Sequence, residues 1–81
     1  MYSAERRWVA VDSETISSIR YAPRTRLLDL KFRKSGVVYR YFEVPAEEHA
    51  EFMAAESKGT YLNRVFKAKR HRYTVVKRRM K

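Results

Sequence analysis

Residues 28–33 alternate apolar and charged side chains without a break, and this period constrains the fold more than any other feature of the chain. The apolar positions are Leu28, Leu30 and Phe32, and the charged ones are Asp29, Lys31 and Arg33. Such alternation is typical of a strand with one buried face. A second apolar segment, residues 37–42, follows Ser35 and Gly36, and glycine suits a tight turn because it adopts positive φ without steric cost. These two segments predict an antiparallel hairpin.

A further strand is predicted just before this hairpin, at residues 16–21. It ends at Ala22, because a residue that precedes proline avoids the helical region and Pro23 suits the first corner of a turn. Residues 8–11 could add an extended segment before it. Strands spaced this closely along the chain predict an antiparallel meander.

The side chains of Tyr39 and Tyr41 share one face of their strand, and those of Arg40 and Phe42 share the other. A loop with an even number of residues would place the tyrosines on the same face as Leu28, Leu30 and Phe32. We therefore expect both rings to be largely buried, with their hydroxyls at the rim or hydrogen-bonded. The alternative is that they stack on nucleotide bases, as exposed aromatic residues of RNA-binding sheets do.

The length of this loop also sets which charges face each other across the hairpin. A four-residue loop would place Asp29 opposite Arg40, whereas a two-residue loop would place Lys31 there, a less favourable pair. A bulge would reverse the assignment of faces.

The period changes after Pro45, which predicts a helix over residues 46–55. Proline is tolerated in the first helical turn, and Glu47 and Glu48 lie where the helix dipole favours anions. Phe52 is a predicted anchor of this helix to the core.

A second helix is predicted to begin at Thr60 as its N-cap, after a break at residues 57–59. Its apolar stripe consists of Leu62, Val65, Phe66 and Tyr73, and the opposite side carries Arg64, Lys67 and His71. Residues 74–76 could add a strand, extend the helix or fray. The expected fold is therefore α+β, with a three-stranded antiparallel β-meander followed by two short helices packed on one face. It divides into an N-terminal extension with a possible extra strand (residues 1–15), a central domain (16–73) and a basic tail (74–81).

The positive charge is confined to one end of the chain. Residues 1–56 carry nine Lys or Arg and nine Asp or Glu, whereas residues 57–81 carry ten Lys or Arg and no acid, so the net charge of +10 arises there. This asymmetry favours a polyanionic partner, and nucleic acid is the commonest. The acidic first helix could neutralise part of this charge within the molecule.

Catalysis, metals and membranes are not favoured. The chain has no cysteine, and its histidines, His49 and His71, fall on different predicted helices without metal-ligand spacing. We expect no enzyme activity, no metal and no cofactor. No apolar run approaches the ~20 residues of a membrane span, and no signal-peptide region is seen, so we expect a cytoplasmic protein without membrane contact.

Several short motifs, taken in order, resemble one family. They are I-S-S-I-R-Y at residues 16–21, L-D-L-K-F at 28–32, Y-R-Y at 39–41 and S-K-G-T-Y-L-N at 57–63. Together they resemble the KTSC domain, a module named for its occurrence at the C-terminus of some lysyl-tRNA synthetases and also found as small stand-alone bacterial and phage proteins. The resemblance covers roughly residues 9–76 and implies RNA as a partner, with no catalytic residue. Arg20 and Ala22 depart from the family pattern, which makes the following turn unusually basic.

The expected function is a small non-catalytic module that binds nucleic acid, RNA rather than DNA, through phosphate contacts. The candidate residues are Arg64, Lys67, Lys69, Arg70, His71, Arg72, Lys77, Arg78, Arg79 and Lys81 at the basic end, with Arg24, Arg26 and Arg40 elsewhere. Tyr39 and Tyr41 are expected to serve the core. The alternative function is a protein-interaction module that docks on an acidic surface, with Phe42 or Trp8 as apolar anchors.

Overall fold

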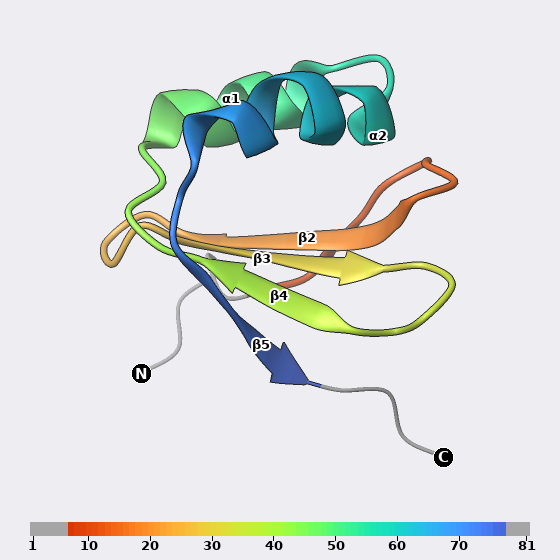
Figure 1. Cartoon of the computed structure of the whole chain (residues 1–81), viewed down its shortest axis with the longest axis horizontal. Helices are drawn as coiled ribbons and strands as arrows, with labels where there is room; N and C mark the ends of the chain where they lie inside the picture. Colours follow the sequence, from red (N-terminus) through yellow and green to blue (C-terminus); the bar gives the residue numbers. More distant parts are fainter. Residues whose placement is uncertain (1–6, 78–81) are drawn as a thin grey trace.

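Five antiparallel strands form one sheet in the order of the chain, and two helical segments cover one face of it (Figure 1). The computed structural model describes residues 7–77. The elements are β1 (Val9–Ala10), β2 (Ile16–Ala22), β3 (Leu27–Phe32), β4 (Val38–Tyr41), α1 (Ala46–Ala54), α2 (Lys58–Tyr61), η2 (Leu62–Phe66), η3 (Lys67–Lys69) and β5 (Tyr73–Lys77). The predicted α+β class is confirmed, but the sheet has five strands and not three.

The two additional strands lie at the two edges of the sheet. β1 has only two residues, so it is too short to show a recognisable alternation, and its Val9 pairs with Ile19 of β2. β5 comes after both helical segments and pairs with β4, for example through Tyr39 and Val75. Its pairing is long-range, which explains why a local pattern left residues 74–76 undecided.

The central hairpin has the register of the four-residue loop. Asp29 pairs with Arg40, and Leu30 pairs with Tyr39 across β3 and β4. Gly36 has a φ of 74°, as the turn prediction requires, and its amide donates to the carbonyl of Phe32 at 2.8 Å. The prediction that the tyrosines share the apolar face of β3 is therefore confirmed.

The first helix, α1, follows Pro45 as predicted and carries Glu47 and Glu48 in its first turn. The helical segment after it begins earlier than expected. Ser57 is its N-cap, with the side chain accepting a hydrogen bond from the amide of Thr60 at 3.2 Å, so the assignment of Thr60 as the cap was wrong. Serine and threonine are both common N-cap residues, and the backbone conformation shows that Ser57 is the cap here.

The second helical segment, residues 58–69, comprises α2, a π-helical turn (η2) and a 3₁₀ turn (η3). Leu62 and Phe66 face the core as predicted, but Val65 is 38% exposed. The segment ends at Arg70, whose φ of 60° places it in the left-handed region. Tyr73 therefore belongs to β5, and its predicted place on the helical stripe was wrong.

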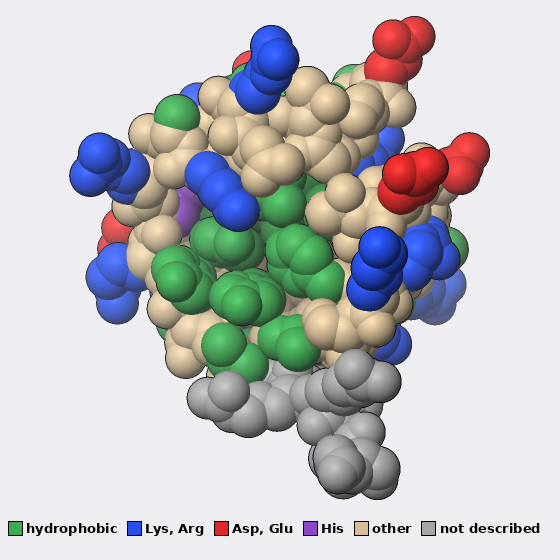
Figure 2. All heavy atoms as spheres, turned by 45° about the vertical axis from the view of Figure 1, so that its right-hand side comes forward, with side chains coloured by type: hydrophobic (Ala, Val, Ile, Leu, Met, Phe, Trp, Pro, Cys, Tyr) green, Lys and Arg blue, Asp and Glu red, His purple; other side chains and the backbone are tan. Residues whose placement is uncertain are grey.

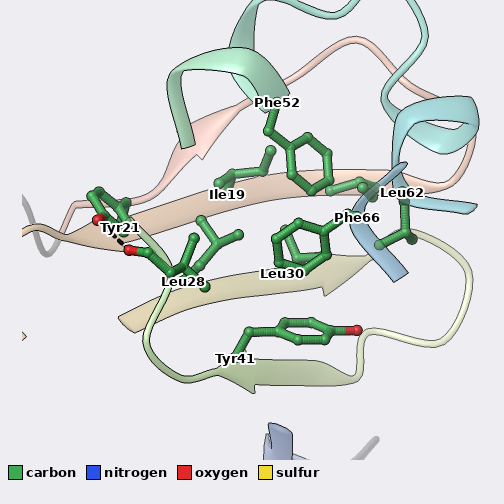
Figure 3. Packing of buried hydrophobic residues seen from close by; sticks show 10 residues of the cluster. Ile19, Tyr21, Leu28, Leu30, Tyr41, Phe52, Leu62 and Phe66 are labelled. Carbon is green, nitrogen blue, oxygen red and sulfur yellow. Dashed lines mark hydrogen bonds between the residues drawn. The ribbon is translucent and has the colours of Figure 1, made fainter. Parts of the chain in front are cut away.

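The core lies between the sheet and the two helical segments. Figure 3 shows Phe52 of α1 and Leu62 of the second helical segment pointing toward the sheet, and both are buried. The sheet contributes Ile19, Leu28 and Leu30 to the same cluster. The hydroxyl of Tyr21 donates to the carbonyl of Val44 at 2.5 Å, which satisfies the polar end of this buried ring. Among the described residues no helix is long and apolar enough to span a bilayer.

Candidate nucleic-acid interface

An open groove lies beside the core, where β4 and β5 extend past the second helical segment. Five aromatic residues line it and define what we call the aromatic groove: Phe32, Tyr39, Tyr41, Phe66 and Tyr73. Its volume is about 660 Å³. Figure 2 turns this side toward the reader and shows hydrophobic side chains gathered in one patch, with Lys and Arg side chains around it.

The rings of the aromatic groove contact one another in a continuous cluster. Tyr73 packs against both Tyr39 and Tyr41, with ring centroids 5.5 Å apart in each case. Phe66 meets Tyr41 edge to face at 4.9 Å, and Phe32 meets Tyr39 in the same way at 5.3 Å. These are favourable aromatic geometries, so the rings are held in place without a ligand.

Burial within the groove is graded. Tyr41 is 7% exposed and belongs to the core, whereas Tyr39 is half-buried and Tyr73 is 58% exposed. The prediction of largely buried tyrosines therefore holds for Tyr41 and only in part for Tyr39. The helical layer lies over β2 and β3 and stops short of β5, which leaves the outer rings uncovered (Figure 1).

The buried end of the groove affects ionisation. Burial, together with the nearby Tyr73 and Tyr39, raises the pKa of Tyr41 to about 12. The Tyr41 hydroxyl therefore stays protonated and neutral throughout the physiological pH range.

Three of the predicted binding residues line the groove beside the rings. Lys67 and Arg70 are exposed, and His71 is half-buried with its ring 5.2 Å from that of Phe66. Arg70 occupies the left-handed region, uncommon for a residue with a Cβ, and this turn brings the chain from the second helical segment down to β5. The structure thus unites part of the predicted basic cluster with the tyrosines.

One carboxylate neutralises another part of that cluster. One carboxylate oxygen of Glu48, in α1, lies 2.6 Å from Nε2 of His71. The other carboxylate oxygen lies 3.6 Å from Nζ of Lys69. The expectation that the acidic helix offsets some of the basic charge agrees with this geometry. Lys69 and His71 are accordingly less available to a phosphate than Lys67 and Arg70.

Arg40 lies on the other face of the sheet, away from the groove. Asp29, with a side chain only 3% exposed, is held between two guanidinium groups: Arg40 at 2.9 Å and Arg20 at 2.7 Å. The hydrogen bond to Asp29 raises the pKa of Arg40 further above its ordinary value. Both arginines serve this buried ion pair, and the placement of Arg40 among the phosphate-binding residues has no support from its surroundings.

The remaining predicted residues are dispersed. Arg24 and Arg26 are exposed in the β2–β3 turn, at the opposite end of the meander from the β3–β4 turn and the groove. Arg72 lies 5.0 Å from the ring of Phe42, and Arg64 lines a separate polar hollow of about 440 Å³ together with Ser57. Lys77 ends β5, while Arg78, Arg79 and Lys81 lie outside the described residues.

Sequence reasoning missed Tyr73, Phe32 and Phe66 as parts of a site. Phe66 and Tyr73 were counted on one helical stripe, and Phe32 was counted as core. The alternation of Tyr73 and Val75 with Thr74 and Val76 was the available signal, but it is too short to distinguish a strand from a frayed helix.

The arrangement can hold flat rings and anions. Within residues 7–77 no group of three His, Asp or Glu side chains is placed to hold a metal ion. His49, the other histidine, stacks on Tyr21 at 4.4 Å, and burial lowers its pKa. Its ring is therefore part of the packing between α1 and β2.

Residues 12–73 match the KTSC domain family, so the chain belongs to the KTSC domain family. Two relatives from bacteria are similar over most of their length. An uncharacterized protein of Stutzerimonas stutzeri is 38% identical over 65 residues, which are 80% of this chain and 90% of the relative. A protein of Tsukamurella paurometabola is 39% identical over 57 residues, which are 70% of this chain and 84% of the relative.

The fold has also been seen in a crystal structure. A KTSC domain protein from Yersinia pestis superposes with a TM-score of 0.80 at 35% identity, covering 88% of this chain and 97% of the other. The resemblance inferred from the motifs is therefore confirmed.

Proposed function

We propose that this protein is a small non-catalytic module that binds nucleic acid, RNA in preference to DNA, on the side of the aromatic groove. The observation that carries the proposal is the placement of exposed Lys67 and Arg70 beside an open cluster of aromatic rings. Cations along a groove attract the phosphate backbone, and aromatic rings stack on bases without regard to sequence. The preference for RNA rests on the occurrence of the family in lysyl-tRNA synthetases. We expect the protein to bind RNA in the cytoplasm.

The available charge sets the expected strength. Four exposed cations of the basic end have no ion pair with a described residue: Arg64, Lys67, Arg70 and Arg72. Each phosphate contact on a single strand adds about 0.7 to the steepness of log K against log salt, so the two cations that line the groove, Lys67 and Arg70, contribute a slope of about −1.4. This favours weak, sequence-tolerant binding.

The experiment is a titration of labelled tRNA and a short single-stranded RNA at two salt concentrations, one of them near physiological ionic strength. The wild-type protein should bind both, with a slope at least as steep as about −1.4. The double variant Lys67→Gln/Arg70→Gln should bind more weakly and lose about 1.4 from the slope, the share of two phosphate contacts.

A charge-matched control distinguishes this site from general attraction. Arg7→Gln/Arg24→Gln removes the same charge from exposed residues elsewhere on the molecule. Equal losses in the two double variants would contradict a site at the groove, and absence of binding even in dilute buffer would contradict the proposal as a whole.

The alternative, docking on an acidic protein surface, would use Trp8 or Phe42 as its apolar anchor. Both rings are half-buried and each already has an arginine over it, Arg20 at 4.2 Å from Trp8 and Arg72 at 5.0 Å from Phe42. No contact among residues 7–77 specifically favours this function.

A further inference from the structure

We infer that the aromatic groove receives one unpaired base of a single-stranded RNA, with Tyr73 as the stacking surface. The inference rests on the proposed function and deepens it, because it names the class of nucleic acid: single strands and loops, in preference to duplexes. The argument depends on the exposure of Tyr73, the shape of the groove and the position of its cations.

Tyr73 is the most exposed of the large hydrophobic residues among those described, at 58%. It is nevertheless fixed, because Tyr39 and Tyr41 pack against its ring and β5 pairs with β4 through Tyr41 and Tyr73. A ring that is held on one side and open on the other is prepared to stack without rearrangement, which lowers the entropic cost of binding.

The groove has the size of a site for a small flat group. Its volume of about 660 Å³ falls within the range of roughly 300 to 1,000 Å³ that is typical of small-ligand pockets. A base inside a duplex is stacked on both faces and cannot present a free face to Tyr73. Proteins that bind single strands without sequence preference stack the unpaired bases on aromatic rings.

The cations are placed for the phosphates on either side of such a base. Lys67 and Arg70 line the same groove as Tyr73 and are exposed. Glu48, which contacts His71 at the edge of the groove, is occupied by His71 and Lys69 at 2.6 and 3.6 Å. Among the described residues no Asp or Glu lines the groove itself, so a phosphate that enters it meets the positive charges of Lys67 and Arg70.

Three tyrosines line the groove, and a tyrosine hydroxyl is neutral at physiological pH. Burial raises the pKa of Tyr41 further, to about 12, so its hydroxyl does not repel a phosphate. Neutral hydroxyls both donate and accept hydrogen bonds, which is compatible with any base.

The opposite face of the sheet offers a built-in comparison. Trp8 is covered by Arg20, whose guanidinium carbon lies 4.2 Å from the indole centroid, and Lys31 lies 5.8 Å from the same ring. A base would have to displace this contact to stack there. The inference therefore assigns the base to Tyr73 and leaves Trp8 unchanged on binding.

The test compares three probes of equal length: a single-stranded RNA, a blunt-ended duplex of the same sequence, and an abasic strand with the same phosphates. Wild-type protein should bind the single strand about 5- to 150-fold more tightly than the abasic strand, which is the fold-change that about 1 to 3 kcal/mol for one stacked base gives. Tyr73→Ser should remove this difference, whereas Tyr73→Phe should keep it and show that the ring, and not its hydroxyl, is required.

The outcomes separate this inference from the proposed function. Equal affinity for all three probes, unchanged in folded Tyr73→Ser, would overturn the inference while leaving phosphate binding in place. Lack of binding to any probe in dilute buffer would overturn both. Circular dichroism of Tyr73→Ser and Tyr73→Phe confirms that each variant retains its sheet, so that a loss of affinity can be assigned to the groove.

Discussion

The ring of Tyr73 lies 5.5 Å from that of Tyr39, so the last described strand completes a surface that begins in the central hairpin. The two residues come from adjacent strands, β4 and β5, that are joined through both helical segments. The two tyrosines of the Y-R-Y motif therefore have different roles. Tyr41 packs in the core, whereas Tyr39 lies with Tyr73 at the open edge of the groove, beside Lys67 and Arg70.

Removing the acid that faces the basic cluster should strengthen RNA binding. Glu48 holds His71 and Lys69, so Glu48→Gln frees Lys69 and removes a negative charge next to the groove. We expect about two- to fivefold tighter binding at low salt and a steeper salt dependence.

Glu47→Gln is the matched control for this experiment. Glu47 is exposed, precedes Glu48 in the same helical turn and forms no ion pair with a described residue. The two variants have the same net charge, so equal affinities would show that Glu48 exerts only a general charge effect, contrary to the prediction.

The ion pairs of Asp29 with Arg20 and Arg40, on the face of the sheet opposite the groove, should stabilise the fold. Asp29 accepts hydrogen bonds from Arg20 and Arg40 at 2.7 to 3.1 Å, and Asp29→Asn leaves two half-buried guanidinium groups without a counter-charge. We expect a loss of about 2 to 4 kcal/mol in the free energy of unfolding. Urea denaturation measures it, with the exposed residue Asp12, as Asp12→Asn, for comparison. A loss below about 0.5 kcal/mol, the usual size for a surface change, would show that the network contributes little.

The glycine of the S-K-G motif should be required by a close contact. A Cβ at Gly59 would lie 2.7 Å from Oγ1 and 3.3 Å from Cβ of Thr15. Gly59→Ala should therefore destabilise the fold by about 1 to 3 kcal/mol, as overpacking does. Adding Thr15→Ala removes the nearer atom and should restore part of the stability. Thermal unfolding of the single and double variants measures these changes in stability. If the loss of stability in the double variant equals the sum of the losses in the two single variants, the predicted clash is contradicted.

Alkaline stability should depend on Tyr41. Its pKa is raised to about 12 from the ordinary 10.0, so the unfolded chain loses this proton at a lower pH than the folded protein does. The stabilising contribution is complete below pH 10 and is lost as the pH rises toward 12. Over that interval the wild-type stability should fall more than that of Tyr41→Phe, by on the order of 1 to 2 kcal/mol. Denaturation curves that stay parallel across the window would contradict the assignment.

Much of the sheet was predictable because its signals are local. The alternation around Asp29 and the turn at Gly36 predicted the face of the tyrosines, which the structure confirms, but left either Asp29 or Lys31 as the partner of Arg40, and the structure shows Asp29. The family resemblance was also accessible, because its motifs lie in these same elements and in the capped segment that follows Ser57.

The groove could not be predicted, because its residues are far apart in the sequence and because the extent to which the helices cover the sheet is not visible in any local pattern. Phe66 and Tyr73 fit a helical spacing, and nothing in the sequence announced that Arg70 would adopt the left-handed conformation that ends the helix. The exposure of Tyr39 depends on how far the helical layer reaches across the sheet, which no strand pattern reports. The capture of His71 and Lys69 by Glu48 similarly joins elements that are distant in the chain.

The most direct measurement is an NMR titration of the isotope-labelled protein with a single-stranded RNA. The account predicts that the ring signals of Tyr39 and Tyr73 and the amides of Lys67 and Arg70 shift together at one affinity, while the Trp8 indole stays unchanged. Shifts confined to Trp8 and its surroundings, or a spectrum that does not respond in dilute buffer, would contradict it.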